Sequence, residues 1–287
     1  MAEEVVSLRV IKVLRRIAVY LFELSNFIID RSNGNIFCLL FNLRSKFLNL
    51  NTRVVSDNGY YKLQDKKNPD FQHFFKAEKQ GNMAYGKGLA ARLKDLSESY
   101  FLEEIDFSDG DTFIDCGANV GDMILVTKNL QARVNYIGFE PSPDEFKCLQ
   151  KNAEGMIIHN LGLWKEEGEL EFFVSSKGAD SSLIRPKFFE SKIDVCTKRL
   201  ESFIDGDVKF LKLEAEGAEP EILEGLGDKL KFIKYISADV GFERGVSEES
   251  TLAEVSNFLI SNNFEMVAIG KKRLCVLFRN MNNKFRV

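Results

Sequence analysis

Thr112-Phe-Ile-Asp-Cys-Gly-Ala-Asn-Val-Gly-Asp122 and, one helix further on, Tyr136-Ile-Gly-Phe-Glu-Pro141 share a pattern. Each begins with a short apolar run between turn signals, which is typical of a parallel strand covered on both faces. Gly117 and Gly121 permit a tight turn into a helix and a close approach of the backbone to a ligand. The two stretches therefore predict a strand, a glycine turn, a helix and a second strand, an arrangement that binds nucleosides at the carboxyl edge of a sheet.

Acidic residues close both predicted strands and indicate which nucleoside binds. Glu140 lies about 20 residues past the glycine turn, where an acidic side chain accepts hydrogen bonds from ribose hydroxyls. A diphosphate cofactor prefers the pattern G-x-G-x-x-G, whereas this turn has fewer glycines and is followed by Asp122, whose charge would repel a diphosphate. S-adenosylmethionine (SAM) instead carries a sulfonium and an ammonium cation, which Asp115 could help to hold. The charges thus favour SAM over a nicotinamide or flavin cofactor.

Composition limits the classes of protein to which the chain can belong. The 287 residues are 45% hydrophobic and 29% charged, which is typical of a globular protein. A net charge of -4 gives no support to a nucleic-acid partner. The five cysteines have no C-x-x-C spacing and there are only two histidines, so we expect free thiols, no zinc site of the usual spacing, and a cytoplasmic location.

Residues 5–29 have helical periodicity with a basic face formed by Arg9, Lys12 and Arg16. Glu23 interrupts the apolar stretch, which disfavours a secretory signal and a transmembrane span. Two interpretations stay open, an accessory helix packed on the domain or on a second copy, and a peripheral helix on a membrane surface. We assign residues 1–84 to an accessory, partly helical region and residues 85–287 to the cofactor-binding domain.

Helices are also predicted over residues 39–48 and 89–105, and Asp57-Asn-Gly59 predicts a hairpin between short strands at 52–56 and 60–63. From Asp111 onward, strand-like and helix-like segments alternate, which predicts a mostly parallel sheet with helices on both faces. The expected strands are 112–116, 135–140, 156–161, 208–214, 233–239, 264–269 and 273–279, with an inserted pair at 169–174 and 193–198. Only Gly270-Lys-Lys separates the last two of the seven, so they form an antiparallel hairpin.

Three motifs resemble the FkbM family of SAM-dependent methyltransferases. Phe113 to Asp122 is similar to its first motif, and Gly138-Phe-Glu-Pro-Ser-Pro143 to its ribose motif. Lys212-Leu-Glu-Ala-Glu-Gly-Ala-Glu219 is similar to its most distinctive run, usually K-I-D-V-E-G-A-E, with Glu214 in place of the usual Asp. The resemblance covers about residues 85–279. It implies a Rossmann-like class I methyltransferase fold with a seven-stranded sheet, and O-methylation of sugars or other small metabolites, often in polysaccharide pathways.

The motifs and the resemblance together give two sets of candidate site residues. Glu214 and Asp239 end neighbouring predicted strands on the acceptor side, and any of the carboxylates there could remove the acceptor proton. Lys212 has either a role in the site or a structural one, neutralising its acidic neighbours. The candidate catalytic residues are Lys212, Glu214, Glu216 and Asp239. The candidate cofactor-binding residues are Asp115, Gly117, Ala118, Asn119, Gly121, Glu140, Pro141, Ser142, Asn160, Asp180 and Ser181.

Several alternatives remain at this stage. The acceptor-side carboxylates could together hold a divalent cation that acidifies the acceptor hydroxyl. A nicotinamide-dependent oxidoreductase and a non-catalytic SAM-binding scaffold, recruited through the amino-terminal helices, are the competing functions. Glu219 opens a predicted helix just before Pro220, so interaction with the helix amino end explains it as well as catalysis does.

Overall fold

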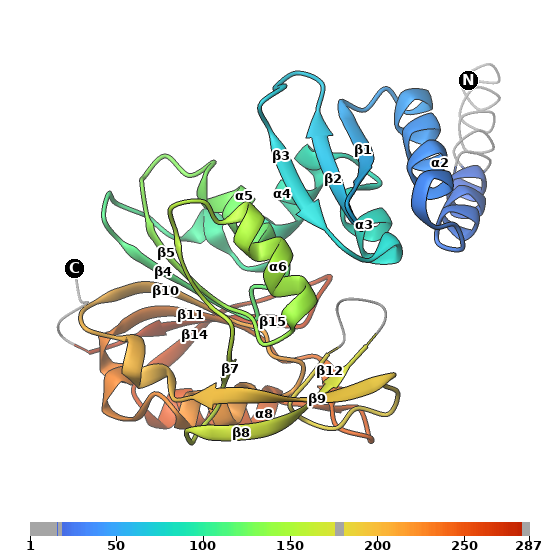
Figure 1. Cartoon of the computed structure of the whole chain (residues 1–287). Coiled ribbons are helices and arrows are strands. Elements are labelled where there is room, and N and C mark those ends of the chain that lie inside the picture. The colour runs from blue at the N-terminus through green and yellow to red at the C-terminus, as the bar shows by residue number, and fades with distance from the viewer. Residues whose placement is uncertain (1–15, 17–18, 176–180, 283–287) are drawn as a thin grey trace, which may run out of the picture.

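A seven-stranded sheet forms the centre of the computed structural model, which describes residue 16, residues 19–175 and residues 181–282 (Figure 1). The order is β14-β15-β11-β10-β4-β5-β6. Only β15 runs antiparallel to its neighbours, which confirms the predicted α/β fold with a carboxyl-terminal hairpin. The strands are β4 (Thr112–Cys116), β5 (Asn135–Phe139), β6 (Ile157–His159), β10 (Val208–Leu213), β11 (Ile233–Asp239), β14 (Phe264–Ile269) and β15 (Cys275–Asn280).

Helices cover both faces of this sheet because successive residues of each buried strand point to opposite sides. Phe113 and Phe210 pack with one layer of helices, and Ile114 and Leu211 with the other. The first layer contains α4 (Leu89–Ser99), α5 (Asp122–Thr127) and α6 (Pro143–Asn152), and the second contains α7 (Glu219–Glu224) and α8 (Leu252–Ser261) (Figure 1). Short 3-10 turns occupy Leu102–Glu104, Leu200–Phe203 and Gly227–Phe232.

Two smaller sheets lie beside the carboxyl edge of the main sheet. The predicted inserted pair is confirmed as β8 (Gly168–Val174) and β9 (Ser191–Lys198), which are antiparallel. The short strand β7 (Gly162–Leu163) pairs with the other edge of β9 and runs parallel to it. The second, β12 (Phe242–Arg244) with β13 (Glu249–Ser250), has no counterpart in the sequence prediction. These strands are too short for a hydrophobic period to show.

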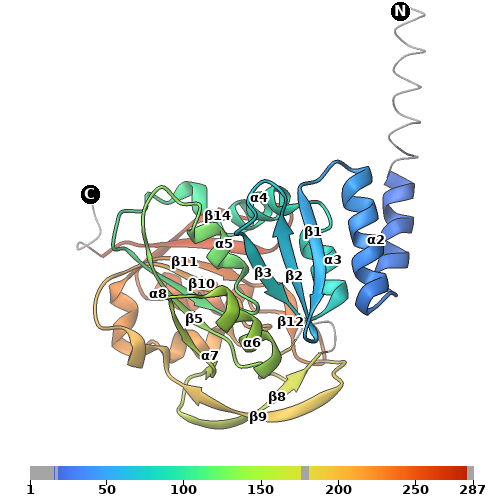
Figure 2. The same ribbon diagram turned by 45° about the horizontal axis from the view of Figure 1, so that its top comes forward.

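The amino-terminal part packs on the helical layer formed by α5 and α6 (Figure 2). The predicted hairpin is confirmed as β1 (Thr52–Asp57) and β2 (Tyr60–Asp65), to which β3 (Gln72–Phe75) adds a strand that the sequence pattern does not reveal. The flanking helices are α2 (Gly34–Phe47), which begins earlier than predicted, and α3 (Glu78–Tyr85). The division of the chain at residue 84 stays a proposal.

The prediction of one helix over residues 89–105 is wrong. Helix α4 ends at Ser99, and Phe101 adopts a left-handed conformation (φ 57°) before the 3-10 turn. This break buries Tyr100 completely and directs its hydroxyl to Glu214, 2.6 Å away. Tertiary contacts with a residue far along the chain thus override the local helical pattern.

The predicted helix at residues 5–29 is helical over residues 19–29, and its basic residues Arg9 and Lys12 lie outside the described residues. Within the described part, no helix combines the length and the hydropathy needed to cross a bilayer. The pair formed by residues 19–29 and α2 exposes a group of large apolar side chains: Val19, Tyr20, Leu21, Leu24, Phe27, Ile28, Ile36, Leu39, Leu43 and Phe47. The contact of this helix with a membrane or a second copy stays a prediction.

Candidate active site

A cavity of about 350 Å³, the cofactor cavity, lies at the carboxyl ends of β4, β5 and β10. Most of the predicted site residues line it: Gly117, Ala118, Asn119, Glu140, Pro141, Ser142, Ser181, Lys212, Glu214 and Glu216. Asp115, Gly121, Asn160 and Asp239 do not line it, and Asp180 lies outside the described residues. The sequence motifs therefore converge on one place in the fold, where open α/β sheets bind their ligands.

The glycine turn after β4 forms one wall of the cavity, and its backbone packs closely against the residue that follows β10. Gly117 has φ +73°, and a Cβ atom there would lie 1.9 Å from the carbonyl oxygen of Glu214. Any side chain at residue 117 would push β4 and β10 apart. Gly121 does not line the cavity but begins α5 in a left-handed conformation (φ +92°), which glycine adopts without steric cost.

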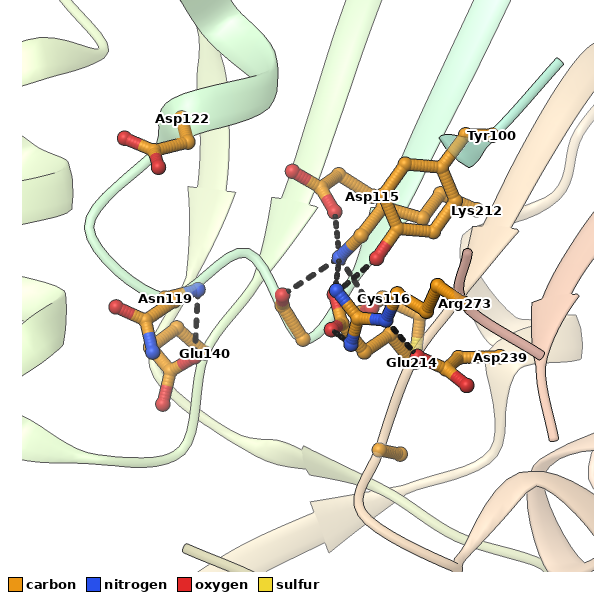
Figure 3. A network of polar contacts seen from close by, with 12 residues as sticks. Tyr100, Asp115, Cys116, Asn119, Asp122, Glu140, Lys212, Glu214, Asp239 and Arg273 are labelled. Atoms are coloured by element: carbon orange, nitrogen blue, oxygen red, sulfur yellow. Dashed lines mark hydrogen bonds and ion pairs between the residues drawn. The ribbon is translucent and has the colours of Figure 1, made fainter. Parts of the chain in front are cut away.

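Glu140 lies at the end of β5 and is almost fully buried, with 6% of its surface exposed. One of its carboxylate oxygens accepts a hydrogen bond from the backbone amide of Asn119 (2.7 Å; Figure 3), and the other accepts one from the amide of Ser142 (2.8 Å). Burial, with the nearby charge of Glu145, raises the pKa of Glu140 to about 8. A carboxylate offers about four acceptor sites, so two amide contacts leave room for ribose hydroxyls.

Asn160, predicted to bind the cofactor, instead holds the loop that carries Glu140. Its side-chain amide donates to the carbonyl oxygens of Glu140 (2.8 Å) and Pro141 (3.2 Å).

Lys212 occupies the centre of a buried ionic network. Its ammonium group contacts Asp115 (2.8 Å), Glu214 (2.9 Å) and the carbonyl oxygen of Gly117 (2.8 Å) (Figure 3). Burial alone would lower the pKa of Lys212, but the charges of Asp115 and Glu214 raise it above its ordinary value. Lys212 therefore stays protonated and fixes β10 to the glycine turn, in agreement with the structural role left open by the sequence.

Asp115 is fully buried, does not line the cavity, and contacts Lys212 and the hydroxyl of Tyr136, the latter at 2.6 Å. The expectation that Asp115 helps to hold the cations of SAM stays a prediction. Its carboxylate orients the ammonium group of Lys212, which in turn donates to the carbonyl oxygen of Gly117 in the glycine turn.

Arg273, from the loop between β14 and β15, joins two of the predicted catalytic carboxylates. Its guanidinium donates to Glu214 and to Asp239, and Tyr100 donates its hydroxyl to Glu214 as well (Figure 3). Burial would raise the pKa of Glu214, but Lys212 and Arg273 hold it well below its ordinary value. Glu214 is thus a permanently charged anchor and a poor proton acceptor at neutral pH.

Asp239 is 1% exposed, and its carboxylate is engaged by Arg273 and by the amide of Gly241 (3.1 Å). Asp239 does not line the cofactor cavity, and its predicted role near the acceptor stays a prediction. Arg273 and Lys212 thus supply the positive charge next to these carboxylates. No group of three or more His, Cys, Asp or Glu side chains within the described residues has a geometry suited to a metal ion.

Asp122 also differs from the sequence expectation, in which its charge repels a diphosphate. Its carboxylate accepts hydrogen bonds from Arg92 (2.7 Å to Nε), from the hydroxyl of Tyr85 (2.5 Å) and from His73 (3.0 Å). Burial opposes ionisation, yet the Arg92 charge and the hydrogen bonds hold the pKa of Asp122 well below its usual range. Because Arg92 neutralises this charge, the argument against a diphosphate rests on the glycine pattern and on the carboxylates around the cavity.

Four residues that contribute to the site were missed by sequence reasoning: Arg92, Tyr100, Glu243 and Arg273. Glu243 lies in β12 and lines the cofactor cavity, and burial, together with the charge of Asp239, raises its pKa to about 8. Only the basic run Lys271-Lys-Arg273 in the predicted hairpin loop offered a signal in the sequence.

The sequence model of the Methyltransferase FkbM domain matches residues 115–266, which include the glycine turn, Glu140 and the Lys212 to Glu219 run. The chain belongs to this family. The family and the fold class predicted from the sequence are confirmed, and SAM is the cofactor. The cavity of this FkbM protein suits the positive charge of SAM, because carboxylates line it, among them the buried Glu140.

Two relatives and one solved structure illustrate the breadth of the similarity. Methyltransferase 1 of Beauveria bassiana (strain ARSEF 2860) is 28% identical over 153 residues, 43% of this chain and 61% of the fungal protein. The hexuronic acid methyltransferase AglP of Haloferax volcanii is 24% identical over 190 residues, 63% of this chain and 75% of AglP. A crystal structure of an FkbM methyltransferase from Methylobacillus flagellatus KT has a TM-score of 0.46 and 15% identity, covering 64% of this chain and 47% of that one. The chain thus spans less than two thirds of the fungal relative.

Proposed function

We propose that the protein is a SAM-dependent O-methyltransferase whose acceptor is a saccharide or a polysaccharide precursor. The observation that carries this proposal is that carboxylates lie at both ends of the cofactor cavity. Glu140 lies at the end of β5, where ribose is expected, and Glu214, Glu216 and Glu243 line the cavity beyond β10. Carboxylates are suited to orient hydroxyl groups and to accept their protons. The relative AglP is a hexuronic acid methyltransferase, and a hexuronic acid belongs to the same acceptor class.

Different residues of the cavity have different roles in such a methyl transfer. SAM supplies an electrophilic methyl group, and transfer to oxygen requires an in-line approach of the acceptor. Glu140 binds the ribose hydroxyls, and the glycine turn, held by Lys212, shapes the wall around the donor. Glu214, fixed by Tyr100, Lys212 and Arg273, is a constant negative charge beside the reacting groups. The acceptor hydroxyl needs a proton acceptor, for which a carboxylate without a cationic partner is best suited.

Isotope transfer tests this function directly. The purified protein is incubated with methyl-labelled SAM and a metabolite extract of cells that lack the gene, with a parallel sample containing EDTA. We expect label in a saccharide fraction, as a base-stable ether. Label in lipids, proteins or nucleic acids would contradict the proposed acceptor. Loss of transfer on EDTA treatment, with recovery on adding Mg²⁺, would establish the divalent-cation alternative.

Calorimetric titration separates the competing functions. We expect SAM and S-adenosylhomocysteine to bind with a single site, and NADH not to bind. Binding of NADH alone would indicate the oxidoreductase alternative. Binding of SAM without transfer to any fraction of the extract would favour the scaffold.

A further inference from the structure

A second cavity of about 330 Å³, the acceptor cavity, adjoins the cofactor cavity. Its walls come from the segment 182–190 and from the β12–β13 hairpin. Glu216 and Glu243 line both cavities, so the two share a wall at these residues. A molecule in the second cavity would therefore lie next to the reactive end of the donor.

The lining of the acceptor cavity has the chemistry of a carbohydrate site. Phe188 and Phe242 line it with 76% and 70% of their surfaces exposed, although large aromatic side chains are normally covered. Exposed aromatic rings offer flat apolar faces against which the C–H face of a sugar ring packs. The carboxylates of Glu190, Glu216 and Glu243 offer acceptors for hydroxyl groups on the same ring.

The charge of this lining selects against an anionic ring. Lys187 is the one cationic side chain among the described residues that line the acceptor cavity, and its ammonium is paired with Glu248 at 3.1 Å. Among the described lining residues, Glu190, Glu216 and Glu248 outnumber this one cation even when Glu243 is protonated, and their charge repels a carboxylate-bearing sugar. The acceptor is thus expected to differ in charge from a hexuronic acid, the substrate class in the name of AglP.

Glu243 differs from Glu214 and Asp239 in that no cation contacts its carboxylate within the described part of the chain. No hydrogen bond or ion pair joins its side chain to another described residue, whereas Glu214 and Asp239 are both held by Arg273. Burial, together with the charges of Asp239, Glu214 and Glu219, raises the pKa of Glu243 to about 8 against the opposing charge of Arg273. A carboxylate with a pKa near the working pH is suited to accept a proton and to release it again.

We propose that the acceptor cavity binds an uncharged hydroxylated ring and that Glu243 accepts the proton of the hydroxyl that is methylated. This rests on the proposed methyltransferase function. The acceptor oxygen forms the new bond to the methyl carbon, and the carbon–sulfur bond breaks with its electron pair remaining on sulfur. The hydroxyl proton passes to the carboxylate of Glu243 and then to water, so S-adenosylhomocysteine and the methyl ether are the products.

Matched glycosides test the charge of the acceptor. Each p-nitrophenyl hexoside of a panel is paired with the hexuronide of the same configuration, and binding to the protein saturated with S-adenosylhomocysteine is measured by saturation-transfer NMR. We expect at least one hexoside to bind, and its hexuronide to bind at least about tenfold more weakly. Phe242→Ala should abolish the binding of that hexoside. Tighter hexuronide binding would overturn the proposal. So would a failure of both series to bind. Failure of the methyltransferase function itself would show separately, either as failure to bind S-adenosylhomocysteine or as no transfer of label from methyl-labelled SAM to any fraction of the extract.

Glu243→Gln tests the proton acceptor with the hexoside that binds best. We expect kcat to fall about 10² to 10⁴-fold, the rise of kcat with pH through about 8 to disappear, and the affinity for S-adenosylhomocysteine to stay within twofold of the native value. Glu249→Gln, at an exposed residue of β13 outside both cavities, is the control and should leave kcat unchanged. An unchanged kcat and pH profile in Glu243→Gln would overturn the assignment.

Discussion

Glu140 and Glu214, which both line the cofactor cavity, have opposite electrostatic states, and their partners explain why. Lys212 and Arg273 hold the pKa of Glu214 down despite its burial, whereas burial and the charge of Glu145 raise the pKa of Glu140 to about 8, since its contacts within the described residues are backbone amides. Glu214 thus suits a fixed negative charge. Glu140, with acceptor sites that amides do not fill, suits the binding of hydroxyl donors.

The role of Glu140 in binding ribose leads to a prediction. Glu140→Ala removes the acceptor for the ribose hydroxyls and should weaken SAM binding by about 1 to 3 kcal/mol in a calorimetric titration. Glu154→Ala, an exposed residue after α6, is the control and should bind SAM as the native protein does. Equal affinities of the two variants would refute the ribose assignment.

At the scale of elements, Asp122 connects the amino-terminal part to the cofactor-binding helix. The first residue of α5 contacts His73 of β3, Tyr85 of α3 and Arg92 of α4. Asn152 at the end of α6 adds two hydrogen bonds to the backbone of Phe74, at 2.7 and 2.8 Å. The glycine turn is thereby fixed from the amino-terminal side as well as from the sheet.

Asp122→Asn should therefore destabilise the fold. It leaves the largely buried Arg92 without its main counter-charge, and we expect the free energy of unfolding to fall by about 2 to 4 kcal/mol in urea titrations. Asp95→Asn removes the other carboxylate near Arg92, which lies 3.8 Å away on the exposed side of α4, and should cost less than about 0.5 kcal/mol. Similar losses in both variants would show that Asp122 has no special role in connecting these elements.

The elements that carry the site residues decide which of these residues can be predicted from the sequence. Gly117 and Glu140 belong to contiguous motifs at strand ends, so periodicity and spacing predict their place, and both line the cofactor cavity. The resemblance to the FkbM family singles out Lys212, which lines the same cavity. Tyr100, Arg273 and Glu243 enter the site from a broken helix, a hairpin loop and a strand of three residues. Only tertiary packing decides the positions of these segments, and apart from the basic run that ends at Arg273 the sequence contains no local signal for them. The direction in which Asp115 faces is likewise set by its partners, Lys212 and Tyr136.

For the whole molecule, the buried carboxylates act on stability in two opposite directions. Asp122 and Glu214 have lowered pKa values, so their contribution is present above the pKa of the unfolded chain, about 4, and is lost as the pH falls further. Glu140 and Glu219 have pKa values raised by burial to about 8 and about 7. The folded protein therefore binds more protons than the unfolded chain between about pH 4.5 and 8, and stability decreases as the pH rises through this range.

Thermal unfolding from pH 4 to 8.5 should accordingly give the highest Tm near pH 5, with a free energy of unfolding about 1 to 3 kcal/mol lower at pH 8. Glu219→Gln isolates one contributor, because the amides of Ala215 and Gly217 both donate to the same oxygen of Glu219, an acceptor that glutamine retains. The variant should fold, and its stability should depend less on pH between 5 and 7, since the uncharged amide no longer loses a proton. Glu201→Gln, at a partly exposed glutamate paired with Arg199, should keep the native slope. A stability of the native protein that rises steadily from pH 5 to 8 would show that folding does not raise the pKa values of Glu140 and Glu219. The electrostatic distinction between Glu140 and Glu214 would then be wrong.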